Sequence, residues 1–152
     1  MNKTTNPSSD SKREIKTRLK NITKNDYKFL YQLLKERNPR ANISHRKMPT
    51  YNEHVKFVTS KPYTIWYLIC HNNKKAGSIY LSKQDEIGLF LKKNMQGKNI
   101  GSEALILLLK NNPRQRYLAN VAPKNYRSIK FFKKNCFKLI QYTYEFNISF
   151  KK

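Results

Sequence analysis

The feature that most constrains the fold is the segment from Glu86 to Glu103, EIGLFLKKNMQGKNIGSE. It begins with a short apolar run, Ile87 to Leu91, which is typical of a buried strand. A polar loop follows, and a strongly apolar helix then begins at Ser102 and Glu103. The N–H groups in the first turn of a helix have no intrahelical partner, and the helix dipole places partial positive charge there. This order of strand, loop and helix predicts an anion site suited to a diphosphate.

The loop contains neither GxxxxGK[ST] nor GxGxxG, two common phosphate-binding motifs. It resembles instead the acyl-CoA loop of the GNAT N-acetyltransferase superfamily, written [QR]-x-x-G-x-[GA], which here reads QGKNIG over residues 96–101. Gln96 and Gly101 match, whereas Asn99 stands where the first glycine is usual. Because Asn is the non-glycine residue that best tolerates a positive φ, we expect Asn99 to support the same loop.

A second motif supports the resemblance. Tyr117 to Val121 (YLANV) reads as another short strand, and the segment after it resembles the GNAT pattern N-x-x-[AS]-[IR]-x-[FL]-[YF]-x-[KR]-x-G-F, with Cys136 in place of the glycine. Two motifs in this order and spacing are far more specific than either alone. The matching positions are Asn120, Asn125, Ser128, Ile129, Phe131, Phe132, Lys134 and Phe137.

The resemblance implies an acetyl-CoA site. In GNAT folds the fourth and fifth strands splay apart, and the pantetheine arm lies in the gap, where strand backbone pairs with it and one N–H polarises the thioester carbonyl. The loop backbone cradles the pyrophosphate, and Lys98 adds charge at its mouth. The residues implied in cofactor binding are Leu89, Phe90, Leu91, Gln96, Gly97, Lys98, Asn99, Ile100, Gly101, Ser102, Asn120, Asn125, Ser128, Phe132 and Lys134.

The rest of the chain predicts one α/β domain over residues 15–152, after a disordered polar tail over residues 1–14. With the GNAT resemblance, we expect a single mixed, twisted sheet of about six to seven strands with helices on both faces. Helices are expected after Asn25 or Asp26, after the Thr50 and Glu53 capping box, and after Asn125. Further strands are expected at 19–22, 63–70, 76–81, 137–142 and 144–150.

Attack of a free amine on a thioester requires a group that removes a proton from the ammonium form. Glu86 is one candidate, because several GNAT relatives place an acidic residue at the start of this strand. Its neighbour Asp85 must face the other way, since strand side chains alternate. His54 is the other candidate, because EHVKF resembles a stretch of amino-sugar acetyltransferases. The alternatives are that Glu86 is paired with a lysine and that His54 is structural.

The family usually protonates the leaving thiolate with a Tyr in the helix after the second motif. Phe132 occupies that position and has no proton to donate. Either Tyr126 or another tyrosine substitutes, or the thiolate leaves without an acid from the enzyme.

The acceptor is predicted from a wider resemblance. The segments EHVKF, YTIWYLI, GSIYL, EIGLFL, YLANV and IQYTYE resemble GNAT enzymes that acetylate nucleotide-activated amino sugars in pseudaminic or legionaminic acid pathways. This implies an acetyl-CoA-dependent N-acetyltransferase whose partner is a small-molecule amine. The alternatives are a protein N-terminus or ribosomal protein as acceptor, or a non-catalytic module that binds acyl-CoA or nucleic acid.

The chain carries 32 basic and 9 acidic residues, a net charge of +23. Its lysines are spread along the sequence instead of clustering with arginines and aromatic residues, which argues against nucleic acid as a partner. Cys70 and Cys136 lack CxxC spacing and predict no metal site. Because no apolar run has the length of a membrane span and no signal core begins the chain, we expect a cytoplasmic monomer or homodimer without membrane contact.

Overall fold

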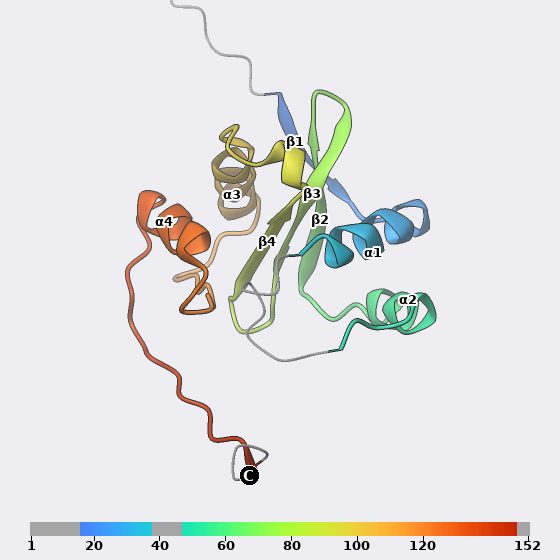
Figure 1. Ribbon diagram of the computed structural model, residues 1–152. Helices are drawn as coiled ribbons and strands as arrows, with labels where there is room; N and C mark the ends of the chain where they lie inside the picture. Colours follow the sequence, from blue (N-terminus) through green and yellow to red (C-terminus); the bar gives the residue numbers. More distant parts are fainter. Residues whose placement is uncertain (1–15, 38–46, 149–152) are drawn as a thin grey trace, which may run out of the picture.

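The computed structural model describes residues 16–37 and 47–148 (Figure 1). The polar tail predicted for residues 1–14 lies outside this part of the chain. No helix within the described ranges is both long enough and apolar enough to cross a bilayer.

A four-stranded antiparallel sheet forms the centre of the fold, in the order β1-β2-β3-β4. Its strands are β1 (Thr17–Asn21), β2 (Ile65–His71), β3 (Lys74–Leu81) and β4 (Ile87–Leu91). The predicted hairpin at HNNKK is confirmed: it joins β2 to β3, and Asn72 and Asn73 have φ angles of 49° and 62°. Two consecutive positive φ angles give the type I′ turn that matches the twist of paired strands.

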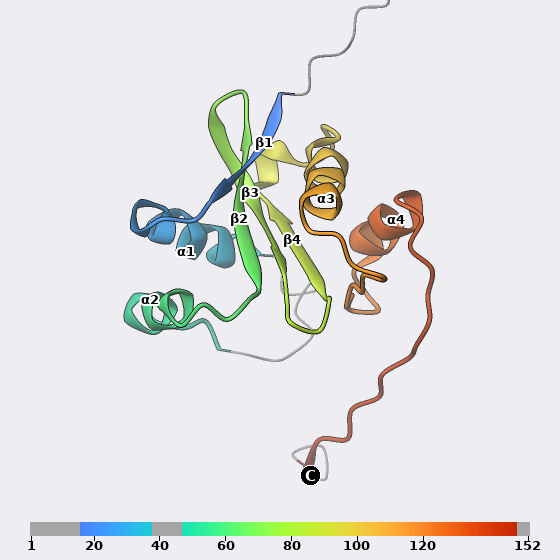
Figure 2. The ribbon, with the colours of Figure 1, turned by 180° about the vertical axis from the view of Figure 1, so that it is seen from behind.

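Helices cover both faces of the sheet, as predicted (Figures 1 and 2). α1 (Tyr27–Lys35) and α2 (Tyr51–Thr59) lie on one face, and α3 (Ile100–Asn111) and α4 (Tyr126–Lys134) lie on the other. Alternate strand residues point to α3 and form the main core with it. The buried members of this core are Ile69, Ala76, Ile79, Leu81, Ile87, Ile100, Ala104, Leu105 and Leu108.

The helix starts agree with the sequence in part. The Thr50 and Glu53 capping box is present, with the Glu53 N–H donating to Thr50 Oγ1 at 3.3 Å. Asp26 does not cap α1 with its side chain. Its buried carboxylate instead accepts from Thr23 and pairs with Lys75 Nζ at 2.7 Å. Asp26 therefore ties the short helix η1 (Lys24–Asp26) to β3.

The predicted mixed sheet of six to seven strands is wrong for the described residues. The segment 117–121 contributes a single parallel bridge, between Glu86 and Leu118, instead of a full strand. The strand expected at 137–142 does not form, and neither does the described part of the one expected at 144–150. From Phe137 the chain runs away from the domain (Figure 1). These residues have strand-like sequence, but a strand also needs a neighbouring edge to pair with.

Candidate active site

The loop between β4 and α3 has the backbone shape that an anion site requires. Gly97 and Asn99 have φ angles of 75° and 63°, and Asn99 is the N-cap of α3. Asn99 therefore adopts the conformation that a glycine would adopt there. The first intrahelical bond joins the Glu103 N–H to the Asn99 carbonyl at 3.1 Å. The amides of Ile100, Gly101 and Ser102 thus have no carbonyl of α3 to bind, and the helix dipole gives them positive character.

The Gln96 side chain anchors the start of this loop. Its Nε2 donates to the Leu91 carbonyl at the end of β4 at 3.1 Å. Its Oε1 accepts from Arg127 Nη1 on α4. The exposed Arg127 guanidinium is thereby held beside the loop.

Helix α4 also contacts the first turn of α3. Asn135 Nδ2 donates to Ser102 Oγ at 3.2 Å. A Cβ placed on Gly101 would lie 3.1 Å from the Phe131 ring, so the glycine permits α4 to approach this closely. The loop, the start of α3 and α4 therefore form one connected unit.

β4 and the segment 117–121 touch at one point and then separate. Glu86 and Leu118 form the parallel bridge, and the Ile87 N–H donates to the Leu118 carbonyl at 2.8 Å. Beyond this point β4 pairs only with β3 among the described residues. Because strand backbone groups alternate in direction, the N–H and C=O of Leu89 point to the same open side as those of Ile87. Backbone polar groups of Ile87 and Leu89 therefore line the side of β4 that faces away from β3.

Glu86 lies where the two segments diverge. Its Oε1 accepts from Asn120 Nδ2 at 2.8 Å, and its N–H donates to Ser82 Oγ at 3.1 Å. Within the described residues it forms no ion pair with a lysine. Asp85 lies in the turn before β4, with a φ of 62°, and its carboxylate pairs with Arg114 at 3.2 Å.

An aromatic cluster lies on the sheet face opposite α3. Trp66, Tyr80 and Gly88 are aligned across β2, β3 and β4. A Cβ on Gly88 would lie 2.1 Å from the Tyr80 ring, so only glycine leaves room for that ring. Tyr63 stacks on Tyr80 at 3.7 Å between centroids. Burial raises the pKa of Tyr80, and the nearby Glu86 carboxylate raises it further, whereas the Tyr63 hydroxyl lowers it.

Arg37 brings a cation to the same cluster. Its guanidinium carbon lies 4.5 Å from the centroid of the Phe90 ring, a cation–π contact. Burial lowers the pKa of Arg37, while Tyr80 and Tyr63 act in the opposite direction. Phe90 pairs with Ser78 of β3, two residues from Tyr80. The Phe90 ring therefore lies on the same sheet face as Tyr80. Sequence reasoning missed Tyr80 and Gly88, because their alignment depends on the register between strands, and it missed Arg37, which follows α1 and is far from Phe90 in the sequence.

The structure does not bring His54 to Glu86. His54 is 4% exposed, its Nε2 lies 3.2 Å from the Tyr27 carbonyl of α1, and its ring centroid lies 5.3 Å from that of Tyr31. Burial lowers the pKa of His54, and the contact with the Tyr27 carbonyl partly opposes that shift. Its contacts join α2 to α1.

The other residues expected at the site cap a helix, pack against other rings or are exposed to solvent. Asn125 Oδ1 accepts the Ser128 N–H at 3.2 Å and caps α4. Phe132 packs edge-to-face with Phe131 and Phe137, with both pairs of centroids 5.1 Å apart. Lys98 and Lys134 are exposed on the loop and on α4. Among the described residues, no group of three His, Cys, Asp or Glu side chains could hold a metal.

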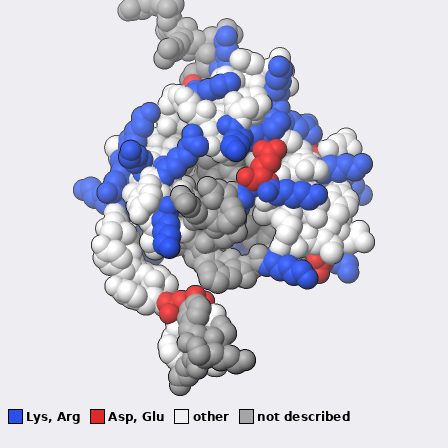
Figure 3. Space-filling model, viewed as in Figure 1, with Lys and Arg blue, Asp and Glu red and all other residues white. Residues whose placement is uncertain are grey.

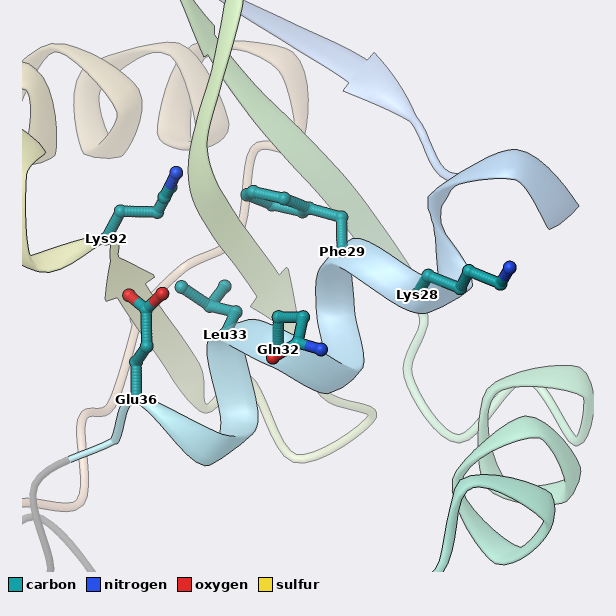
Figure 4. Close-up of a pocket in the computed structure, with 6 residues that line it drawn as sticks. All are labelled: Lys28, Phe29, Gln32, Leu33, Glu36 and Lys92. Atoms are coloured by element: carbon teal, nitrogen blue, oxygen red, sulfur yellow. The ribbon is translucent and has the colours of Figure 1, made fainter.

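A pocket of about 320 Å³ lies between α1 and the end of β4 (Figure 4). Glu36, at the end of α1, and Lys92, after β4, lie on one side of it, and Leu33 and Phe29 of α1 lie beside them. It is on the same face as the aromatic cluster. The lining residues are Lys28, Phe29, Gln32, Leu33, Glu36 and Lys92.

Residues 27–136 match the model of the acetyltransferase (GNAT) family. This match covers well over half of the chain and includes the first sequence motif and all but the last residue of the second. The chain belongs to the GNAT family. It is an N-acetyltransferase, and its cofactor is acetyl-CoA. Among curated proteins no match was found.

Solved structures share the GNAT fold. A domain from Methanocaldococcus jannaschii is 28% identical, with a TM-score of 0.71 over 86% of this chain and 93% of that one. The Salmonella typhimurium acetyltransferase that modifies the N-terminal serine of ribosomal protein L7/L12 is 20% identical, with a TM-score of 0.63 over 79% of each chain. The microcin C7 self-immunity acetyltransferase MccE, in complex with acetyl-CoA and AMP, is 16% identical, with a TM-score of 0.57 over 76% and 74%.

The residues present fit the GNAT cofactor. Acetyl-CoA supplies an activated acetyl thioester and carries its charge on phosphates. The loop offers the amides of Ile100 to Ser102 to a pyrophosphate, and the open edge of β4 offers the Leu89 backbone to an extended amide chain. Arg127 adds a guanidinium beside the loop. It was missed from the sequence because it occupies an unspecified position of the second motif.

Proposed function

We propose that this GNAT enzyme acetylates the amine of a nucleotide-linked amino sugar. The observation that supports this acceptor is the cluster of Arg37, Tyr63, Trp66 and Tyr80 on the sheet face from which Glu86 projects. A nucleotide-linked sugar carries a diphosphate that a guanidinium attracts, together with rings that stack on aromatic side chains. A polycationic acceptor would be repelled by a chain of net charge +23.

The reaction forms a C–N bond and breaks the thioester C–S bond. We propose that Glu86, held by Asn120 at 2.8 Å, accepts the proton of the acceptor ammonium directly or through water. The Leu89 N–H at the open edge of β4 would donate to the carbonyl oxygen on which charge develops. Because Phe132 has no proton to give, we propose that solvent takes the second proton lost by the attacking nitrogen and gives one to the departing thiolate.

We further propose that the loop residues 96–102, with Arg127, bind the phosphates of the cofactor. Asn125 and Ser128 then act by starting α4 at the right place, not by contacting the cofactor with their side chains. His54 is assigned a structural role between α1 and α2.

The test is an acceptor panel with acetyl-CoA, in which released thiol is measured. The panel contains a uridine diphosphate-linked amino sugar, the same amino sugar without its nucleotide, and a peptide with an N-terminal serine. We expect kcat/KM for the nucleotide-linked sugar to exceed that of the free sugar by about 100-fold, because only the former has a diphosphate for Arg37. Equal rates for the two sugars, or preference for the peptide, would contradict the proposal.

Two variants sharpen this comparison. Arg37→Gln should reduce the preference for the nucleotide-linked sugar while the rate with the free sugar stays within about threefold. Arg114→Gln is the matched control, because Arg114 pairs with Asp85 away from the aromatic cluster. If both variants reduce the preference equally, Arg37 does not recognise the acceptor.

A further inference from the structure

A hydrogen-bonded chain of three side chains joins the edge of the sheet to the first turn of α3. Thr17 begins β1 and is 3% exposed. Its hydroxyl donates to Glu103 Oε2 on α3, and its Oγ1 lies 2.9 Å from Nδ1 of His71, the β2 residue that pairs with it. These residues are far apart in the sequence and belong to neither sequence motif, so only the fold brings them together.

The direction of each hydrogen bond follows from the protons that the groups carry. A threonine hydroxyl has one proton, and a carboxylate can only accept. Because the Thr17 proton goes to Glu103, Thr17 Oγ1 accepts from His71, and we infer that Nδ1 of His71 carries a hydrogen. The chain therefore runs in one direction, from His71 through Thr17 to Glu103, and each bond polarises the next.

No basic side chain of the described residues pairs with the Glu103 carboxylate. Lys and Arg side chains are spread over the visible face of the domain, whereas acidic ones are few (Figure 3). Yet in the described ranges the ion pairs are Lys75 with Asp26 and Arg114 with Asp85, and neither includes Glu103. A hydroxyl therefore holds a carboxylate in the first turn of α3, the helix whose start is the proposed phosphate site.

The start of α2 shows where a first-turn glutamate points when it contacts only its own helix. Glu53 Oε2 accepts the N–H of Thr50, three residues earlier, at 2.7 Å. The residue three before Glu103 is Ile100, and side chains on a helix lean toward its N-terminus. A released Glu103 carboxylate can thus reach an amide of the proposed phosphate site. In the structure it points to β1 instead.

We propose that Thr17, itself fixed by His71, is a positioning residue for cofactor binding. It holds the Glu103 carboxylate against β1 and so leaves the first-turn amides of α3 to the phosphates of acetyl-CoA. This inference rests on the proposed placement of the phosphates at residues 96–102. A carboxylate that takes one of these amides also brings negative charge to about 5–6 Å from a phosphate, so its release should weaken CoA binding by about tenfold or more.

Titration calorimetry with CoA at about 0.05 M salt compares Thr17→Val with Thr17→Ser. Valine has the shape of threonine and favours strands, so the variant should fold. It fills the space of Oγ1 between His71 and Glu103 but offers no proton. We expect Thr17→Val to raise the Kd for CoA by about tenfold or more, and Thr17→Ser, which keeps the hydroxyl, to stay within about twofold of the wild type.

The same substitution in a Glu103→Gln background separates charge from packing. Glu103→Gln removes the negative charge and nearly keeps the side-chain shape, so adding Thr17→Val to it should change the Kd for CoA by less than about twofold. If Thr17→Val weakens CoA binding equally in both backgrounds, Thr17 acts through the fold alone and the proposal is overturned. An unchanged Kd in Thr17→Val with Glu103 present overturns it as well.

Gly101→Glu and Gly101→Gln distinguish this failure from failure of the proposed phosphate site. If these two variants differ in CoA affinity while Thr17→Val binds CoA like the wild type, the phosphate site stands and only the role of Thr17 is lost. If the two Gly101 variants bind CoA equally, the phosphates lie elsewhere and both proposals fail. Thermal melting of every variant checks that each titration measures folded protein.

Discussion

Gly101 is the position at which a single charge tests the pyrophosphate loop. A Cβ added there would lie 3.1 Å from Cε2 of Phe131 and 3.6 Å from Cδ1 of Leu91, so any side chain displaces the Phe131 ring by a few tenths of an ångström. Gly101→Glu and Gly101→Gln impose the same displacement, because the two side chains have nearly the same shape. They differ by one negative charge in the first turn of α3. The comparison therefore isolates electrostatics from packing.

The size of the difference follows from the position of the residue. If a diphosphate lies on the first-turn amides of α3, a carboxylate at Gly101 is about 5 Å from a phosphate charge, and at an effective dielectric constant of about 20 the repulsion is about 3 kcal/mol. That energy corresponds to an increase in Kd of about 100-fold. The same charge has the opposite effect on the stability of the fold, because a carboxylate at a helix N-terminus stabilises the helix by about 0.3–1 kcal/mol. Gly101→Glu should thus be no less stable than Gly101→Gln and yet bind CoA far more weakly.

Titration calorimetry with CoA and thermal melting of both variants measure these two quantities. The difference in Kd between Glu and Gln should shrink as salt is raised, since ions screen exposed charges. Equal CoA affinities for the two variants at low salt would refute the placement of the pyrophosphate at this helix start. Loss of CoA binding in both, with intact folding, would instead assign the effect to the displaced Phe131 ring.

Three further predictions concern the site and the fold. Glu86→Gln should lower kcat by about 100-fold or more while CoA affinity stays within about twofold, and Asp85→Asn should leave kcat unchanged; an unaltered rate in Glu86→Gln would show that Glu86 does not transfer the proton. The pKa of His54 is lowered from 6.5 by burial, so the unfolded state binds this proton more tightly and stability is lost as pH falls from about 6.5 through the folded pKa. Urea unfolding at about pH 7.5 and 5.5 measures this loss. Between these pH values the free energy of unfolding should fall less for His54→Gln than for the wild type, and His54→Gln should retain its kcat at neutral pH. Cys136→Gly should stabilise the protein by about 0.5–1 kcal/mol in urea, because the φ of 67° suits glycine, and Cys136→Ala should not.

Features encoded within a few residues could be predicted from the sequence. The Thr50 and Glu53 capping box and the Asn-Asn hairpin depend on contacts between neighbours in the chain, and both are present. The segment 137–150 also has a clear local pattern, but a strand forms only against an edge of matching polarity. Local sequence reports the tendency to form a strand and does not report whether an edge is available. Within residues 137–148 neither of the two expected final strands forms, although the local pattern favours both.

The candidate site divides in the same way. The conformation of the loop 96–101 could be predicted, because positive φ at Gly97 and Asn99 and the start of α3 are local properties. The proposed acceptor face could not be predicted, because Trp66, Tyr80 and Gly88 meet only through the register of three strands. In the sequence Gly88 is an ordinary glycine within an apolar run. In the structure it is the space into which the Tyr80 ring fits.

β4 connects the two halves of the proposed chemistry through the alternation of a strand. Ile87, Leu89 and Leu91 direct their side chains to the α3 core and their backbone groups to the open edge, where an extended cofactor chain can pair. Glu86 and Phe90 direct their side chains to the opposite face, where the proposed acceptor lies. A shift of one residue in this register would exchange the two sets, burying the Glu86 carboxylate in the core and exposing the leucines. The packing of three apolar side chains against α3 is therefore what holds the proposed base on the acceptor side of the cofactor.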